Sequence, residues 1–157
     1  MADTRITPTT LPDGAMVSLL SVLGDEGVTN SYTHQVWSVR GGPSVTRTEG
    51  RDETAKTTYV AFTLPDQVLH APAREDIVDP AYEYPRANPD AALCHLMYVH
   101  LGGDFGRLPF ELELDDLDRP RIKRISTAMG IADEMEAYLA TVLDLNREQD
   151  VAPGLGI

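Results

Sequence analysis

The chain has 157 residues, of which 42% are hydrophobic, and a formal net charge of −12. This length suits one domain with a core of its own, and the hydrophobic content excludes a disordered chain. The acids lie mainly in the second part of the chain: residues 1–60 hold seven acids and five bases, whereas residues 61–157 hold eighteen and eight. Only two of the thirteen bases are lysines, which is typical of a GC-rich genome and equally of a salt-adapted host.

Two classes of protein are disfavoured by the pattern of apolar residues. The first residues lack the apolar stretch of a signal peptide, and no apolar run is long enough to cross a bilayer. We therefore expect a cytoplasmic protein with no membrane partner. The single cysteine, Cys94, excludes an internal disulfide, and its apolar surroundings favour a position in the core over a catalytic role.

The first elements in chain order are predicted to be strands. Residues 5–23 predict an N-terminal hairpin that turns at Pro12-Asp13-Gly14, because these residue types favour tight turns. Residues 33–40 alternate as a further strand, and Val45–Pro65 has two strand-like arms around a charged tip. In the second arm Val60, Phe62 and Leu64 share one apolar face, so we expect that face to be buried.

After Pro65 the pattern becomes less regular. Ala71–Ala92 carries four prolines and little periodicity, which predicts a long surface loop, and long structured loops are often functional. Leu93–Leu101 is predicted to be a strand that is apolar on both faces. Phe110–Asp116 alternates apolar and acidic residues, which predicts a half-exposed strand.

The C-terminal part is predicted to be helical. Asp118 can cap a helix whose first turn holds Pro120, and an apolar stripe at steps of three and four follows. Gly130 lies within that stripe and predicts a break into two helices. The chain is thus expected to be a single domain, 1–157, of class α+β: strands over about 5–116, helices over about 118–147 and a short non-helical tail, 148–157.

Residues that carry chemistry are few, and no known catalytic or nucleotide-binding motif is present. We expect no enzyme, no cofactor and no metal. His95 and His100, five apart on a predicted strand, face opposite sides and are expected to be partly buried and bonded to backbone. Glu111, Glu113 and Asp115 can hold a hard cation, but a solvated acidic face is the simpler interpretation. The bases of Arg119–Arg124 are expected to pair with neighbouring aspartates or, less simply, with a partner's acids or a phosphate.

The hairpin at 45–65 resembles the central strand pair of the coat proteins of single-stranded RNA bacteriophages, the leviviruses. In that family a strand of the type V-T-x-S leads through a basic turn to K-Y-x-V-x-V and often a proline. The corresponding residues are Val45-Thr46-Arg47-Thr48, then Arg51 and Lys56, then Tyr59–Pro65. An aromatic strand before the hairpin, a loop and a long strand after it, and two final helices follow the family's order, although the acidic 102–116 segment is longer than the family pattern.

This resemblance implies a levivirus coat-like intertwined dimer, formed by an N-terminal hairpin, an antiparallel sheet and two C-terminal helices that cover the partner's sheet. It further implies a capsid protein that assembles into an icosahedral shell around single-stranded RNA, and that also binds a genomic hairpin as a repressor. The location implied is the virion, assembled in the bacterial host cytoplasm. The inner face of the sheet, predicted to bind RNA, comprises Ser38, Arg40, Thr46, Thr48, Lys56, Tyr59, Ala61 and Thr63. The helical residues predicted for the dimer interface are Ile125, Met129, Met135, Leu139 and Val142.

Two other classes of function remain open on sequence grounds. The first is a structural or adaptor protein of a tailed DNA virus from a GC-rich or halophilic host. The second is a small acidic cytoplasmic enzyme that uses His95, His100 or the row from Glu111 to Asp115.

Overall fold

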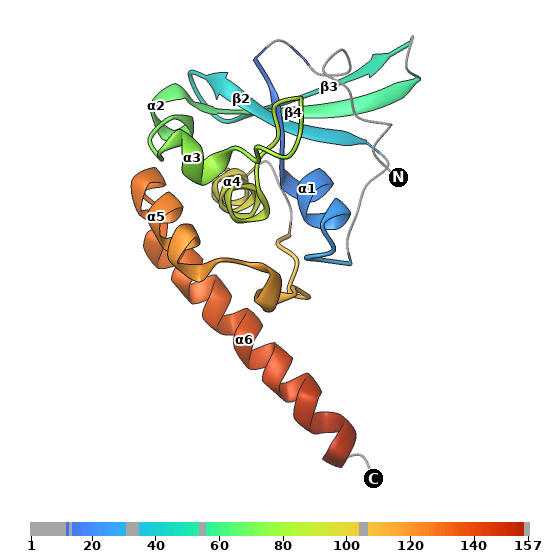
Figure 1. Ribbon diagram of the computed structural model, residues 1–157, viewed down its shortest axis with the longest axis vertical. Coiled ribbons are helices and arrows are strands. Elements are labelled where there is room, and N and C mark those ends of the chain that lie inside the picture. Colours follow the sequence, from blue (N-terminus) through green and yellow to red (C-terminus); the bar gives the residue numbers. More distant parts are fainter. Residues whose placement is uncertain (1–11, 13, 31–34, 54–55, 104–106, 156–157) are drawn as a thin grey trace.

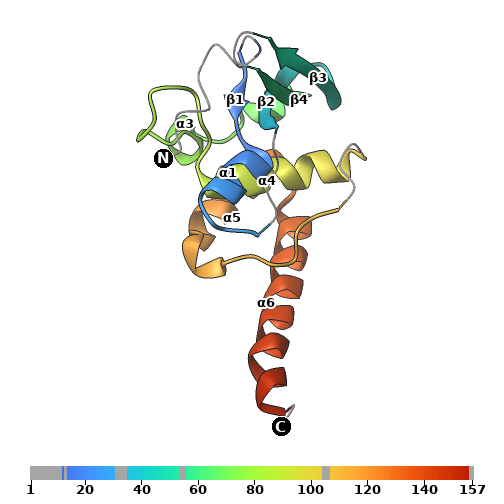
Figure 2. The same cartoon turned by 90° about the vertical axis from the view of Figure 1, so that its right-hand side faces the viewer.

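The computed structural model describes residues 12, 14–30, 35–53, 56–103 and 107–155. A four-stranded sheet lies over a layer formed by α1 and α4, and α5 and α6 lie beyond that layer (Figures 1 and 2). The α+β class is therefore confirmed. The elements are β1 (Met16–Val17), α1 (Leu19–Asp25), β2 (Val36–Gly42), β3 (Thr46–Asp52), β4 (Thr57–Pro65), α2 (Asp66–Leu69), α3 (Arg74–Ile77), α4 (Pro89–Leu101), the 3-10 turn η3 (Leu114–Asp116), α5 (Arg119–Met129) and α6 (Ala132–Leu155).

The order of the strands in the sheet is β1-β2-β4-β3. The β1–β2 and β3–β4 pairs are antiparallel, but β2 and β4 are parallel, so the prediction of an antiparallel sheet is wrong at the centre. The cause is the path of the hairpin. β3 and β4 pair with each other as predicted, and β4 then lies next to β2 in the middle of the sheet. Its apolar side chains are covered best in that central position.

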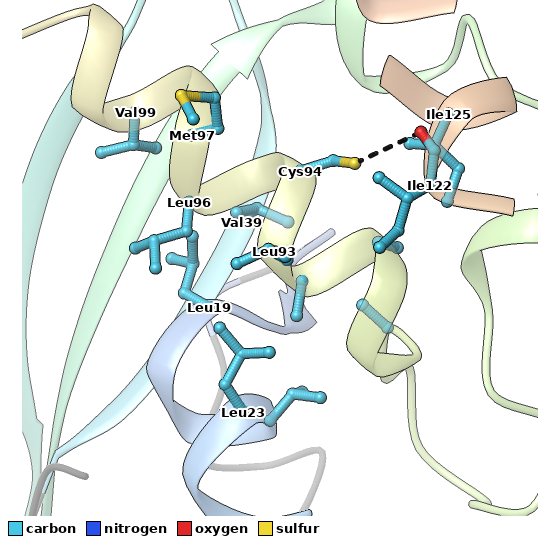
Figure 3. Close-up of a cluster of buried hydrophobic side chains, with 14 of the residues drawn as sticks. Leu19, Leu23, Val39, Leu93, Cys94, Leu96, Met97, Val99, Ile122 and Ile125 are labelled. Carbon is cyan, nitrogen blue, oxygen red and sulfur yellow. Dashed lines mark hydrogen bonds between the residues drawn. The ribbon is translucent and has the colours of Figure 1, made fainter. Parts of the chain in front are cut away.

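The predicted alternation of β4 is confirmed. Val60, Phe62 and Leu64 are fully buried, and they share a face with Trp37 and Val39 of β2. The rings of Trp37 and Phe62 lie 5.4 Å apart, a tilted pair. Figure 3 shows that this face meets α4, because Val39 lies among the side chains of that helix.

The first predicted hairpin is only partly described. Residues 5–11, its first arm, lie outside the described residues. In its second arm only Met16–Val17 forms a strand, and the prediction of a strand through Leu23 is wrong because α1 begins at Leu19. Leu19, Val22 and Leu23 are fully buried and stand at the spacing of one helical face, so burial of that face favours the helix.

The largest correction concerns residues 93–101, which form the second part of helix α4 and not a strand. The Asn88 side chain accepts a hydrogen bond from the Ala91 N–H at 2.8 Å, and Pro89 occupies the first turn. The helix packs against the sheet, α1 and α5, so it is apolar on all sides and its sequence shows no helical period. In Figure 3 Leu93 and Leu96 lie near Leu19 of α1, while the Cys94 thiol reaches the Ile122 carbonyl at 3.9 Å.

The predicted strand at 110–116 is also absent from the described structure. Leu112 forms one isolated bridge with Thr29, and η3 follows at once. Of the predicted inward side chains, Leu112 is buried, Leu114 is half-buried and Phe110 is exposed. No neighbouring strand among the described residues pairs along this segment, so alternation alone does not make it part of the sheet.

The two C-terminal helices are confirmed. The Asp118 carboxylate caps α5 by accepting from the Arg121 N–H at 3.1 Å, and Gly130, at a φ of 79°, ends that helix in the left-handed conformation. The prediction of a non-helical tail is wrong, because α6 continues to Leu155. Each residue added to an existing helix forms a hydrogen bond, so a long helix can include residues that disfavour helix initiation.

Candidate assembly and nucleic-acid surface

Seven of the eight residues predicted to bind RNA lie on one face of the sheet, opposite the helices, whereas Lys56 lies just before β4 and outside the paired strands. The register places Arg40, Thr63 and Thr46 in one cross-strand row and Ser38, Ala61 and Thr48 in the next. Tyr59 follows on the same face, opposite Gly50. The predicted division into two faces is therefore confirmed, whereas contact with RNA stays a prediction.

These residues differ in how far a ligand can reach them. Ser38 and Ala61 are fully buried, and Thr63 is 9% exposed. The Thr63 hydroxyl is used within the protein: it donates to the Ser44 carbonyl at 2.6 Å, and it accepts from the Thr46 N–H at 3.0 Å. The exposed or half-exposed members on the strands, which we name the outer polar face, are Arg40, Thr46, Thr48 and Tyr59, and Lys56 is exposed in the turn before β4.

Tyr59 owes its position on the outer polar face to Gly50. A Cβ at residue 50 would lie 2.3 Å from the Tyr59 hydroxyl oxygen, so the phenol ring fills the space above the glycine. Aromatic side chains that cover a glycine on the neighbouring strand pin the register of a sheet. The ring is half-buried and presents part of its surface to solvent.

The arginines of β3 belong to the opposite face. The Arg47 guanidinium lies over the Phe62 ring at 5.8 Å, as strict alternation predicts. Arg47 also pairs with Glu49 at 3.0 Å, and Arg51 pairs with Glu53 at 3.3 Å. Of the four cations that the sequence offers for RNA, Arg40 thus lies on the outer polar face, and Lys56 lies exposed in the turn before β4.

β3 forms an edge of the sheet. It pairs with β4 on one side, and no strand of the described residues pairs with its other side. Five of its seven residues are exposed. The side chains on one of its faces, continued by Glu53 at the tip, alternate in charge along the strand: Arg47, Glu49, Arg51 and Glu53. From the sequence this region was predicted to be a charged tip, and the alternation of its charges was the signal that was missed.

The residues predicted for a helical dimer interface lie inside a single chain. All five are at most 5% exposed: Ile125, Met129, Met135, Leu139 and Val142. They belong to the apolar core that α5 and α6 complete. The dimer itself stays a prediction, but in this structure it requires another surface.

The predicted surface loop at 71–92 is part of the fold. Val17 donates to the Pro85 carbonyl at 3.0 Å and accepts from the Ala87 N–H at 2.8 Å, so the loop pairs with the outer side of β1. Arg86, 1% exposed, pairs with Asp25 at 3.4 Å and with Glu26 at 3.2 Å. The loop thus has a core role, which its many prolines did not indicate, and Arg86 had no signal in the sequence.

The α5 cations are held partly by acids that the sequence did not suggest. Arg121 pairs with Asp90 at 2.9 Å, in addition to the predicted neighbour Asp118. Arg124 binds Asp76 of α3 through two hydrogen bonds of 3.1 and 2.9 Å. The Arg124 guanidinium lowers the pKa of Asp76.

The groups considered for catalysis lie in different surroundings. His95 is fully buried on α4, its Nδ1 lies 2.7 Å from the Ser18 hydroxyl, and desolvation lowers its pKa to about 4. Its partner is therefore a side chain, and the prediction of a backbone partner for this histidine is wrong. Burial raises the pKa of the Cys94 thiol. Glu111, Glu113 and Asp115 are exposed, and the described residues include no group of three side chains placed to hold a metal ion.

Comparison with family models, with curated proteins and with solved structures finds no match to this chain. Within the described ranges no helix combines the length and the apolar character that crossing a bilayer requires.

Proposed function

We propose that the protein is a structural subunit that pairs with a second copy through the β3 edge and presents the outer polar face of the joined sheet to single-stranded RNA. The observation that supports this best is the exposed β3 edge, whose charges are complementary to themselves. An unpaired strand edge is a template for another strand, and antiparallel pairing of identical strands closes a two-fold dimer.

The charges select one register for this pairing. If the two β3 strands pair about Gly50, Glu49 faces Arg51 of the partner subunit and Arg47 faces Glu53 of the partner subunit. Pairing about Glu49 instead places Glu opposite Glu and Arg opposite Arg. Directly opposed unlike charges contribute roughly 0.2–1 kcal/mol each, and like charges oppose pairing. The backbone hydrogen bonds supply the association, and the charges fix its register.

The dimer proposed here keeps one part of the coat-like arrangement and lacks another. Side chains that face each other across an antiparallel pair point to the same side of the sheet. The helices of both copies therefore lie on one face of an eight-stranded sheet, and the two outer polar faces become continuous on the other. The helices of each copy cover their own sheet, because the α5 and α6 residues that were predicted for the dimer interface lie in the core of a single chain. Closed shells remain part of the proposal.

The dimer is tested by exchanging charges. Glu49→Arg and Arg51→Glu each place like charges opposite each other, so we expect each variant to be monomeric in sedimentation analysis. The double variant Glu49→Arg/Arg51→Glu restores unlike pairs and should dimerise as the wild type does. An equimolar mixture of the two single variants should form heterodimers. Glu134→Arg, which reverses an exposed charge on α6, is the matched control.

Two results contradict the dimer. The first is a wild-type chain that stays monomeric at high micromolar concentration. The second is dimerisation that neither single variant weakens. Pairing about Thr48 would place Arg47 opposite Glu49 of the partner subunit. In that register the double variant would not regain dimerisation, so the same variants also identify the register.

RNA contact is tested separately. Arg40→Ala with Lys56→Ala should reduce the RNA recovered with the protein and flatten the salt dependence of binding by about one unit of log–log slope for each phosphate that the variant no longer neutralises. Arg119→Ala with Lys123→Ala, two exposed cations of α5, is the matched control. Unchanged RNA binding in the first pair contradicts the assignment, and reduced binding in the second pair moves the RNA site to α5. Electron microscopy of the chain expressed in bacteria shows whether shells form.

A further inference from the structure

A second candidate site lies at the β1 edge of the sheet, which is the edge opposite β3. A pocket of about 540 Å³ opens between β1, β2 and the segment that carries α2 and α3. Its apolar lining is supplied mainly by Met16, Val39, Leu69, Pro72, Ile77 and Pro85. Pockets of this size with mostly apolar walls are typical of sites for small molecules.

The walls of the pocket are held in place by contacts outside it. The Asn88 side chain donates to the Asp76 carbonyl at 2.7 Å, and the Asn88 N–H donates to the Ile77 carbonyl at 2.8 Å. Arg124 binds Asp76 from the side of α5, and Pro85 accepts a backbone hydrogen bond from β1. The pocket therefore cannot close by a small shift of α3, and it is preformed for a ligand.

Two nitrogen-bearing side chains stand among the apolar residues that line this pocket. They are His70 and Arg74, both exposed. The His70 Nδ1 lies 3.0 Å from the Asp66 carbonyl oxygen, to which it donates, so its Nε2 remains for other contacts. Within the described part of the chain the Arg74 side chain forms neither an ion pair nor a hydrogen bond, although its backbone carbonyl accepts from the Val78 N–H at 3.0 Å.

The arginines near Arg74 do have carboxylate partners. Arg86, Arg121 and Arg124 each bind at least one carboxylate at 3.4 Å or less. In a chain with a net charge of −12, a guanidinium that has no carboxylate partner among the described residues and lies beside an apolar pocket is an available anion site. Of the acids that follow Arg74 on α3, Asp76 is bound by Arg124 and Glu75 is exposed. Acids farther away than about 8 Å act weakly because their charges are screened at physiological salt.

We propose that this pocket binds a small amphipathic carboxylate, with the carboxylate on Arg74 and the hydrocarbon body on the apolar lining. A guanidinium binds a carboxylate through two parallel hydrogen bonds, and the apolar body gains by leaving water. The site is independent of the proposed dimer, since β1 and β3 are opposite edges of the sheet. The two proposals therefore fail or succeed separately.

Decanoate is the probe, and decanol and decyltrimethylammonium are the matched ligands with a neutral and a cationic head. Titration calorimetry on the full chain should show decanoate binding about tenfold more tightly than decanol, as a charge-assisted hydrogen bond predicts. Arg74→Gln should remove this preference while leaving decanol binding within about twofold. Lys123→Gln, which removes a cation of α5, should change nothing. Val78→Trp, a larger side chain at a half-buried lining position, should block all three ligands.

The proposal is overturned if decanoate does not bind at millimolar concentration. It is also overturned if Arg74→Gln keeps the preference for decanoate, or if decyltrimethylammonium binds more tightly than decanoate. Decanoate binding that Val78→Trp leaves unchanged places the ligand elsewhere and equally rejects this site. Circular dichroism of each variant confirms that the fold is retained before the affinities are compared.

Discussion

The two edges of the sheet are protected by different means. At the β1 edge the backbone is covered: the loop at 85–87 pairs with Val17, and the buried Arg86 ties that loop to α1. At the β3 edge the described backbone is uncovered, and charged side chains line the strand. A covered edge cannot accept another strand, whereas a charged edge accepts only a strand with complementary charges. One edge therefore closes the fold, and the other remains available for assembly.

The largest expected effect comes from uncovering the β1 edge. Arg86→Ala leaves Asp25 and Glu26 without their cation and removes a fully buried side chain. We expect a decrease of roughly 4 kcal/mol in the free energy of unfolding, measured by urea denaturation. Arg51→Ala, at the exposed edge, is the control and should cost less than about 0.5 kcal/mol. Similar decreases in both variants would show that the two edges do not differ as described.

A pH dependence should follow from the contact that ties the end of β1 to α4. The folded chain keeps His95 neutral down to its pKa of about 4, whereas the unfolded chain protonates it near 6.5. The unfolded state therefore binds more protons between these values, and stability falls as the pH falls below 6.5, by up to roughly 3 kcal/mol at pH 4.

His95→Leu tests this assignment. Denaturation at pH 7, 5.5 and 4.5 should show that the variant lacks the loss of stability below pH 6.5. The buried Asp90 does not produce such a loss, because burial raises its pKa and therefore acts in the opposite direction. A variant that retains the wild-type pH dependence would assign the effect to other groups. Asp76 does not interfere in this window, because its pKa is lowered from an ordinary value already below 4.

A smaller effect is expected at the outer polar face. In Gly50→Ala the new Cβ displaces the Tyr59 ring, which is half-buried and can move, so the unfolding free energy should fall by about 1 kcal/mol. In a Tyr59→Ala background the clash is absent, and Gly50→Ala should then be neutral or stabilising, because alanine loses less backbone entropy than glycine. Equal effects in both backgrounds would show that Gly50 and Tyr59 are not energetically coupled.

The smallest effect on the single chain should come from the β3 charges themselves. Glu49→Arg changes an exposed ion pair, so the unfolding free energy of the monomer should shift by less than about 0.5 kcal/mol. Denaturation at low protein concentration measures this. A large decrease in the unfolding free energy would mean that Glu49→Arg disrupts the fold of the monomer. The monomeric state of this variant would then not be evidence for pairing through the β3 edge.

The features that could be predicted from the sequence are those for which a local residue pattern is compatible with one structure only. The two faces of β4, the cap at Asp118 and the break at Gly130 depend on local rules of alternation, capping and glycine conformation. Helix α4 was missed because a helix buried on all sides shows no period, although Asn88 followed by Pro89 is a helix-start signal that could have found it.

The remaining errors come from distant contacts. No local pattern states that β4 lies between β2 and β3, or that Arg86 meets the end of α1, about sixty residues away. Ser38 and Ala61 were predicted to bind RNA together with the rest of their face of the sheet, but both are buried. Burial depends on what packs above a residue, which alternation cannot show.

The central position of β4 also sets an order of events in time. The β3–β4 hairpin is local and can form within about 10 μs, whereas the helix that covers its apolar face is not complete until Leu101 has been synthesised. At about 5–20 residues per second, the 36 residues from Asp66 through Leu101 take roughly 2–7 s. During those seconds Val60 and Phe62 are uncovered on a nascent chain. The alternating charges of β3 then protect the nascent hairpin against aggregation, because they oppose pairing with any strand that lacks the complementary order of charges.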